Sequence, residues 1–218
     1  MSVSTGESIR GRLNLSTNSS NVECEGCYAF SGFGASGVMY DELKIITYPD
    51  PRLRKISAPV RKFGENLEAL ARRMFELMRA SKGVGLAAPQ VGENIRLFVC
   101  NHSGKPEDDR VYVNPVISDA EGDETSEEGC LSLPEIHVEV NRAKTAKMSA
   151  KDLSGNAIEQ TETGYIARIW QHELDHLNGV LIIDQMGPTA KMESRKTLKD
   201  LEDKYEAERP AEERPKKR

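Results

Sequence analysis

The sequence predicts an α+β fold in which mostly antiparallel sheets pack around one central helix, with a further helix near the C-terminus. Three observations predict this class. Short apolar strand patterns outnumber helical patterns and alternate with them irregularly. Residues 164–179 form one amphipathic helical pattern. Residues 189–208 form a second helical pattern, which is charged and only weakly amphipathic.

The composition is ordinary for a soluble globular chain. The 218 residues suffice for one domain with a sizeable core. With 30 basic and 35 acidic residues the net charge is −5, which argues against DNA or another nucleic acid as the main partner. No apolar run approaches the roughly 18 residues of a membrane-spanning helix. Four cysteines do not suggest a disulfide scaffold, so a reducing compartment fits better.

The chain divides into three predicted parts. Residues 1–40 are rich in Ser, Thr, Asn and Gly and lack apolar periodicity, which predicts a flexible N-terminal extension. A single compact domain is predicted over residues 41–208. Residues 209–218 form a charged tail that we expect to be solvated.

The extension has two interpretations. Arg10 and Arg12 among hydroxyl residues suggest an organellar transit segment, although nearby glutamates count against one. Met39 directly precedes the first ordered-looking segment, so an over-extended start is the alternative. Cys24 and Cys27 could bind a metal, but no second pair follows, and we favour an incidental pair.

The first half of the compact domain contains predicted strands and one helix. Leu43–Tyr48 is a short apolar strand that the breaker Pro49-Asp-Pro51 ends. Glu65–Ser81 carries an apolar stripe with the 3.6-residue period, which predicts a core-facing helix. Arg96–Cys100 and a segment near Val111–Asn114 are further predicted strands.

The second half begins with an acidic stretch. Ser118–Glu128 is interpreted as a connection because of its charge. Ala146–Ala150 and Ala157–Gln160 are two predicted strands, joined at Ser154-Gly-Asn156, which is a hairpin signal. The charged helix over residues 189–208 then follows the central one.

The central helix is predicted from its apolar spacing and its ends. Thr163 can serve as its N-cap, and Gly179 stands where a helix ends through a left-handed residue. Apolar residues recur between these ends at three- and four-residue intervals and define one buried face: Ile166, Ile169, Trp170, Leu174 and Leu177.

Two histidines on this helix suggest a metal site. His172 and His176 are four residues apart, so their rings project side by side from adjacent turns. With Glu173 they form H-E-x-x-H, which supplies two nitrogen ligands and a carboxylate that can move protons on a metal-bound water. The alternative is an amphipathic helix whose histidines share a face by chance. A catalytic site needs a third protein ligand, so the motif alone does not decide between them.

Cys130 is the candidate third ligand. It lies in Glu128-Gly-Cys-Leu-Ser132, and a cysteine thiolate binds Zn²⁺ or Fe²⁺ strongly. The alternative is a small buried cysteine with no ligand role. The presence of the two histidines in the same chain favours the metal ligand.

Three segments together resemble the signature of the peptide deformylase family. They are Gly83-Val-Gly-Leu-Ala-Ala-Pro-Gln90, Glu128-Gly-Cys-Leu-Ser132 and Gln171-His-Glu-Leu-Asp-His176, in the family's order and spacing. Tyr48-Pro-Asp-Pro-Arg-Leu-Arg54 also resembles the family's opening segment. The similarity covers roughly Leu43–Tyr205 and leaves out the extension and the tail.

The resemblance implies a metal-dependent hydrolase that removes the N-formyl group from the N-terminal formyl-methionine of newly made polypeptides and releases formate. Cys130, His172 and His176 match the family's metal ligands. Fe²⁺ is the metal that the resemblance implies, with Zn²⁺, Ni²⁺ or Co²⁺ as substitutes. A divalent ion held by one thiolate and two imidazoles keeps a positive charge and lowers the pKa of bound water toward about 7.

The resemblance also assigns the remaining site residues. Glu173 would transfer protons, while the Gln90 side-chain amide and the Leu131 N–H would donate to the developing oxyanion. Three positions would offer backbone groups to an extended peptide: Val84, Gly85 and Gly129. Three side chains would line the methionine pocket: Leu131, Tyr165 and Ile169. His137 stands where many bacterial relatives place an Arg near the substrate backbone, and it is either a substrate contact or an exposed loop residue.

Two other functions compete with this reading. An ordinary H-E-x-x-H peptidase would take a third His or Glu downstream, but no His follows His176. A non-enzymatic protein could bind nascent chains or the ribosome through the charged helix of residues 189–208, and a ribosome contact could also accompany catalysis. A bacterial cytoplasm fits the sequence, and an organelle stroma or matrix is the alternative.

Overall fold

The computed structural model describes residues 40–209. The expectations for the N-terminal extension, including the Cys24 and Cys27 pair, therefore lie outside the described residues, as does the tail beyond Arg209.

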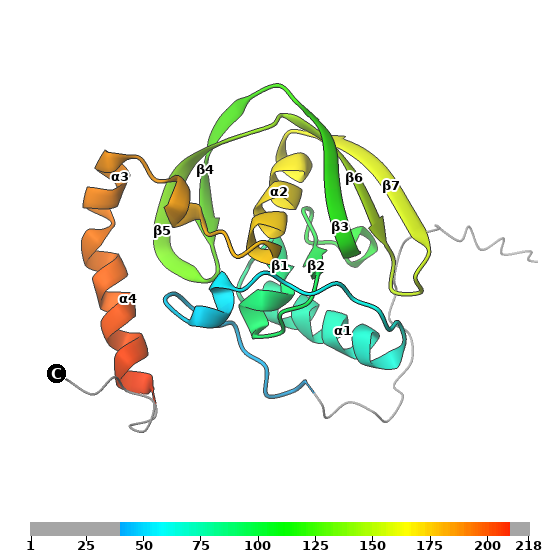
Figure 1. The fold of residues 1–218 in the computed structure, drawn as a ribbon, viewed down its shortest axis with the longest axis horizontal. Helices are drawn as coiled ribbons and strands as arrows, with labels where there is room; N and C mark the ends of the chain where they lie inside the picture. Colours follow the sequence, from blue (N-terminus) through cyan, green and yellow to red (C-terminus); the bar gives the residue numbers. More distant parts are fainter. Residues whose placement is uncertain (1–39, 210–218) are drawn as a thin grey trace, which may run out of the picture.

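Two antiparallel sheets and a helix between them make up the domain (Figure 1). The larger sheet has the strand order β1-β2-β3-β6-β7. Its strands are β1 (Gly85–Ala87), β2 (Leu97–Cys100), β3 (Arg110–Glu121), β6 (Thr145–Lys151) and β7 (Ala157–Thr163). The smaller sheet pairs β4 (Glu124–Cys130) with β5 (Leu133–Arg142), and we call this pair the β4–β5 ribbon.

Helix α2 (Tyr165–Leu177) lies between the large sheet and the ribbon (Figure 1). The other helices are α1 (Glu65–Ala80), α3 (Pro188–Glu193) and α4 (Arg195–Glu208). Short 3₁₀ turns connect several elements: η1 (Pro51–Arg54), η2 (Ala88–Val91), η3 (Pro106–Asp108) and η4 (Ile182–Gln185). The predicted α+β class, with antiparallel sheets, a central histidine-bearing helix and a C-terminal helix, is confirmed.

Helix α1 covers one face of the large sheet. Its predicted apolar stripe is buried and packs against Leu86, Leu97 and Val99 of β1 and β2. Burial of such side chains contributes about 1.5–3 kcal/mol each to folding. The prediction for this helix is correct to within one residue, because Ser81 caps its C-terminus.

Helix α2 is fixed to the other face of the large sheet by an aromatic contact. Trp170 is fully buried, and its ring packs edge-on against Tyr112 of β3 with centroids 5.6 Å apart. The predicted N-cap is wrong, because Thr163 ends β7 and donates its hydroxyl to the carbonyl of Lys144. Gly164 takes the capping position with a positive φ of 62°.

The end of α2 is a point where only glycine fits. Gly179 has a φ of +73°, as the sequence predicts, and an added Cβ would lie 2.6 Å from the backbone oxygen of Arg54. Gly104 has a φ of +78° with no atom within 4 Å of an added Cβ. Both glycines therefore have a left-handed backbone, but only at Gly179 would an added Cβ clash with a neighbouring atom.

We expect Gly104→Ala to lower the free energy of unfolding by about 1–2 kcal/mol, the cost of a left-handed backbone. Gly179→Ala should lower it by more, because the backbone of Arg54 cannot give way as a flexible side chain would. Urea unfolding of both variants measures the difference. Equal losses would show that the contact with Arg54 does not constrain the end of α2.

The first predicted strand is wrong. Leu43–Tyr48 joins no sheet, because two of its backbone donors go to different elements, the 3₁₀ turn η2 and the turn between β4 and β5. Ile46 N–H donates to the Gln90 carbonyl at 2.8 Å, and Tyr48 N–H donates to the Ser132 carbonyl at 2.9 Å. The segment thus ties η2 to the turn between β4 and β5, where the first two deformylase-like motifs end.

The acidic stretch is strand rather than connection. β3 continues to Glu121 and β4 begins at Glu124, so Ser118–Glu128 lies almost entirely in strands. The sequence interpretation also missed β5, where buried Ile136, Val138 and Val140 alternate with exposed residues. The acidic stretch resembles a loop because successive residues, 118–121 and 125–127, are all exposed and largely polar, so no alternation is visible. In β5 the exposed face carries polar and charged residues. The β6–β7 hairpin is confirmed.

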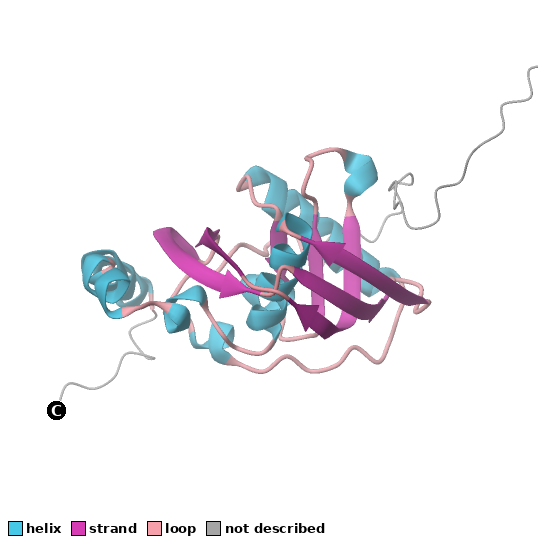
Figure 2. Cartoon of the chain, turned by 90° about the horizontal axis from the view of Figure 1, so that it is seen from above, coloured by secondary structure: helices cyan, strands magenta, loops and turns pink. Residues whose placement is uncertain are grey.

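The C-terminal helix is broken into α3 and α4 at Ser194. Viewed from above, α4 lies at one end of the molecule, beyond the ribbon (Figure 2). Leu198 and Leu201 attach it to an apolar cluster that includes Leu53 and Val138. Within residues 40–209, no helix is long and apolar enough to cross a membrane.

Candidate metal centre

Three predicted ligands converge between α2 and the ribbon. Cys130 ends β4, and His172 and His176 project from successive turns of α2. One donor atom from each lies within 4.8 Å of the others. The Cys130 Sγ is 3.2 Å from the His176 Nε2, and the two imidazole centroids are 5.0 Å apart.

This donor set fits a divalent transition metal. A thiolate and two neutral imidazoles are ligands that iron and zinc accept, and they leave a fourth position open. Burial lowers the pKa of His176 well below its ordinary value, which keeps the ring in the neutral, ligating form. The residues present can therefore hold one cation.

Glu128 orients the first histidine. Its Oε2 lies 2.9 Å from the His172 Nδ1, so the opposite nitrogen of the ring is the one available to a metal. Burial opposes ionisation of Glu128, but hydrogen bonds from His172 and Arg142 outweigh it and lower the pKa to about 2. The sequence interpretation gave neither Glu128 nor Arg142 a role. Glu128 could have been found, since it stands in the same motif as Cys130.

Glu173 lies beside the ligands in a nearly closed environment. Its side chain is buried, and burial raises the pKa of its carboxyl to about 7. The Oε2 atom has no hydrogen-bond partner among residues 40–209. An added Cβ at Gly85 would lie 2.2 Å from the Oε1 atom, so β1 approaches this carboxyl as closely as a backbone can.

Gln90 presents its amide nitrogen to the site. Its Oε1 accepts a hydrogen bond from the Ala87 N–H at 2.9 Å, so the oxygen end of the amide is held by the backbone and the nitrogen end faces the site. Its Nε2 donates to the Ser132 hydroxyl at 3.2 Å and lies 3.6 Å from the Cys130 Sγ. A buried amide donor is thus aimed at the space next to the sulfur.

A cleft of about 360 Å³ opens onto these groups. Ligands Cys130 and His172 line it, while His176 lies behind them and is fully buried. Every other predicted site residue also lines it: Val84, Gly85, Gln90, Gly129, Leu131, His137, Tyr165, Ile169 and Glu173.

The rim of the cleft is more polar than its floor. The side chain of His137 is 61% exposed and lies 3.6 Å from the Glu127 carboxylate. Lys82 and Glu135 also line the cleft, and sequence reasoning did not identify them. Both have a positive φ, of 55° and 64°. Neither lies in a motif or a periodic pattern, so the sequence offers no signal that could have found them.

A family model described as Polypeptide deformylase matches residues 42–192. This chain belongs to the polypeptide deformylase family. The peptide deformylase of Thermotoga petrophila is 46% identical over 159 residues, which are 72% of this chain and 95% of that protein. A chloroplastic peptide deformylase of Oryza sativa is 43% identical over 75% of this chain and 62% of that protein. The crystal structure of the Plasmodium falciparum peptide deformylase has a TM-score of 0.74 and 40% identity, and covers 77% of this chain and 99% of that one.

The family confirms the expectation drawn from the three motifs. This deformylase is a metal-dependent hydrolase that removes the N-formyl group from nascent polypeptides. Cys130, His172 and His176 form the Cys-His-His metal site that is typical of deformylases.

Because β1 of the deformylase passes so close to Glu173, Gly85 allows a direct test. In Gly85→Ala the new Cβ must displace the Glu173 carboxyl. We expect kcat to fall about 10²-fold, as for a misplacement of about 1 Å in an active site, while metal binding persists. Steady-state kinetics with metal analysis measures both. Gly187→Ala is the control, since no atom lies within 4 Å of an added Cβ there. Equal kcat values in the two variants would contradict this packing.

Proposed function

We propose that Cys130, His172 and His176 hold one Fe²⁺, and that this centre hydrolyses the formamide bond of N-formylmethionyl peptides. The observation that carries the proposal is the meeting of the three donor atoms within 4.8 Å, beside Glu173 and Gln90, at the base of one cleft. When bound, the cation supplies Lewis-acid polarisation and lowers the pKa of a water molecule. Zn²⁺, Ni²⁺ or Co²⁺ would fit the same donors.

Two donors would bind the formyl oxygen as charge develops on it. One is the Gln90 amide, whose Nε2 is directed at the space beside Cys130. The other is the backbone N–H of Leu131, which follows Cys130 and lines the cleft. Loss of one such donor typically lowers turnover by about 10²–10³.

Glu173 would move the protons. It takes a proton from the attacking water and passes it to the nitrogen of the leaving amine. A C–O bond forms at the formyl carbon as its C–N bond breaks, which yields formate and a free N-terminal amine. A carboxyl with a pKa of about 7 is suited to both halves of this transfer.

The cleft would bind the peptide in an extended form. Backbone groups of Val84 and Gly85 on one wall and of Gly129 on the other could pair with it as with an added strand. The methionine side chain would occupy the apolar end, which Leu131, Tyr165 and Ile169 line. His137 would contact the peptide at the rim, where its ring is exposed.

The test is formate release from a formyl-Met tripeptide by protein loaded with iron without oxygen. We expect stoichiometric release of formate and of the free amine. The matching acetyl-Met peptide should be a poor substrate, because its methyl group enlarges the acyl group at the reacting carbon. Protein that holds one metal and releases no formate would contradict the proposal. Cleavage of internal peptide bonds would instead favour a peptidase.

We also propose a location and a partner. The bacterial relatives support the bacterial cytoplasm, and the chloroplastic relative supports the alternative, an organelle stroma or matrix.

A ribosome contact through α4 would use its exposed charges, such as Lys196 and Lys204. Truncation after Gly187 would remove Leu198 and Leu201 from the core, so Lys196→Glu with Lys204→Glu is the sharper test. Unchanged co-sedimentation with ribosomes would contradict this contact.

A further inference from the structure

The three metal ligands stand on two bodies that share no sheet. Cys130 belongs to the β4–β5 ribbon, which is separate from the five-stranded sheet. Most of their apolar side chains belong to separate clusters, although Leu131 beside Cys130 packs against the cluster of α1 and the large sheet. Ile169, Trp170 and Leu177 of α2 pack with the large sheet, while the apolar face of the ribbon packs with Leu53 and Leu181. The cluster that Leu131 joins contains no residue of α2, so apolar packing does not by itself set the distance between the sulfur and the imidazoles.

Two buried arginines bridge this gap in opposite directions. Arg168 of α2 reaches the ribbon, where its Nη1 donates to Glu128 Oε1 at 2.8 Å and to the Val140 carbonyl at 2.9 Å. Its Nη2 donates to the Glu124 carbonyl. Arg168 thereby holds a carboxylate and the backbones of both strands of the ribbon.

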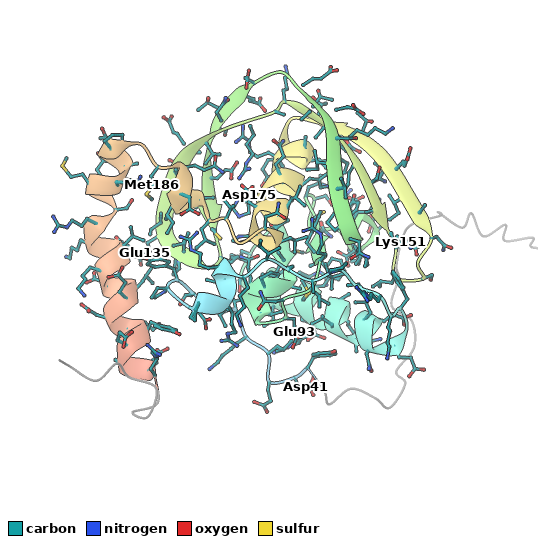
Figure 3. The ribbon with its side chains drawn as sticks, viewed as in Figure 1. Asp41, Glu93, Glu135, Lys151, Asp175 and Met186 are labelled. Atoms are coloured by element: carbon teal, nitrogen blue, oxygen red, sulfur yellow. The ribbon has the colours of Figure 1, made fainter. Side chains whose placement is uncertain are left out.

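Arg142 of β5 makes the return connection. It donates to Glu128 through Nε at 2.6 Å and Nη2 at 2.9 Å, and its Nη1 donates to Asp175 Oδ2 on α2 at 2.9 Å. Asp175 stands on the side of α2 that faces the ribbon (Figure 3), one residue before His176. Both arginines are more than nine-tenths buried.

We propose that Arg142 and Arg168 are positioning residues that clamp the ribbon onto α2 and so set the meeting of Cys130 with His172 and His176. A buried ion pair adds little net stability compared with apolar packing, whereas its fixed forks impose a geometry. Glu128 is shared by both arginines and by His172, so the clamp also fixes the orientation of the His172 ring. This inference rests on the proposed ligand roles of Cys130, His172 and His176.

The test measures metal binding by the full chain rather than turnover. Arg142→Lys and Arg168→Lys keep the charge and lose the fork. We expect each to weaken metal affinity about 10–100-fold in competition with a chelator, the usual effect of losing a partner that orients a ligand. Arg79→Lys is the control for loss of an arginine fork, because Arg79, although partly exposed, pairs with the buried Asp109 carboxylate away from this site. Arg79→Lys should leave the metal affinity unchanged, even if it lowers the stability of the metal-free protein as much as Arg142→Lys or Arg168→Lys does.

The absorption spectrum of cobalt-loaded protein reports whether the Cys130 sulfur still contacts the metal in the arginine variants, which keep the positive charge. Because the clamp holds the sulfur, the sulfur-to-cobalt charge-transfer absorption per bound ion should fall in both arginine variants. Full absorption and unchanged affinity in both variants would overturn the clamp. If neither variant folds, Asp175→Asn removes only the partly exposed end of the bridge and should shift affinity and spectrum in the same direction, less strongly. No shift in that variant would overturn the clamp as well.

The outcome also separates this inference from the proposed function. A wild-type protein that fails to bind one equivalent of Co²⁺ would refute the ligand set. A wild-type protein that binds Co²⁺, together with arginine variants that match it, would refute only the clamp.

Discussion

Replacing Cys130 with alanine is expected to abolish stoichiometric metal binding and to reduce deformylation to the level without enzyme. The substitution leaves only two imidazoles, and a catalytic centre of this kind needs three protein ligands. The sulfur is also the only donor that the ribbon contributes among the three that meet. Elemental analysis of the purified protein and a formate assay measure the two losses.

Cys100 provides the matched control for this thiol. It is buried in β2 and is the other free cysteine within residues 40–209. Cys100→Ala removes a sulfur from the core and should lower the stability of the domain, yet it should keep one metal per chain. If Cys130→Ala still bound one equivalent of metal with wild-type affinity, the proposed ligand set would be wrong.

Glu173→Gln should separate chemistry from binding. The amide has nearly the shape of the carboxyl but cannot accept and return a proton. We expect kcat to fall by about 10²–10⁴ while metal content stays at one per chain. Single-turnover formate release at saturating peptide measures the chemical step directly.

The control for Glu173 is a glutamate of the same chain that is remote from the cleft. Glu159 on β7 is exposed and pairs with Lys147. Glu159→Gln should leave kcat unchanged. A Glu173→Gln protein with wild-type kcat would exclude Glu173 as the proton carrier, and one without metal would show that the carboxyl supports the ligands instead.

The elements that the sequence predicts well are those with a buried and an exposed face of regular period. Helix α1 and the β6–β7 hairpin follow from apolar spacing and from one turn signal. The ribbon was missed because successive residues of β4 are exposed and polar or charged, which resembles a loop in composition. The segment at Ile46 was misassigned because a segment that is hydrogen-bonded to η2 and to the β4–β5 turn has the same apolar pattern as a strand.

The site could be predicted only in part. The motifs place His172, Glu173 and Cys130, and the structure brings them together. The residues around them could not be predicted in the same way. Arg142 and Arg168 are buried charges whose partners lie on other elements. From the sequence, Arg168 is either a group near the ligands or a surface arginine, and the buried phase of β5 that includes Arg142 is evident only once that strand is recognised.

X-ray absorption at the metal edge of the loaded wild-type protein tests the central claim most directly. We predict one sulfur and two imidazole nitrogens per metal ion, with the sulfur at about 2.3 Å when the ion is zinc. The sulfur should disappear from the spectrum of Cys130→Ala and stay in that of Cys100→Ala. A metal surrounded only by nitrogen and oxygen in the wild-type protein would contradict the account.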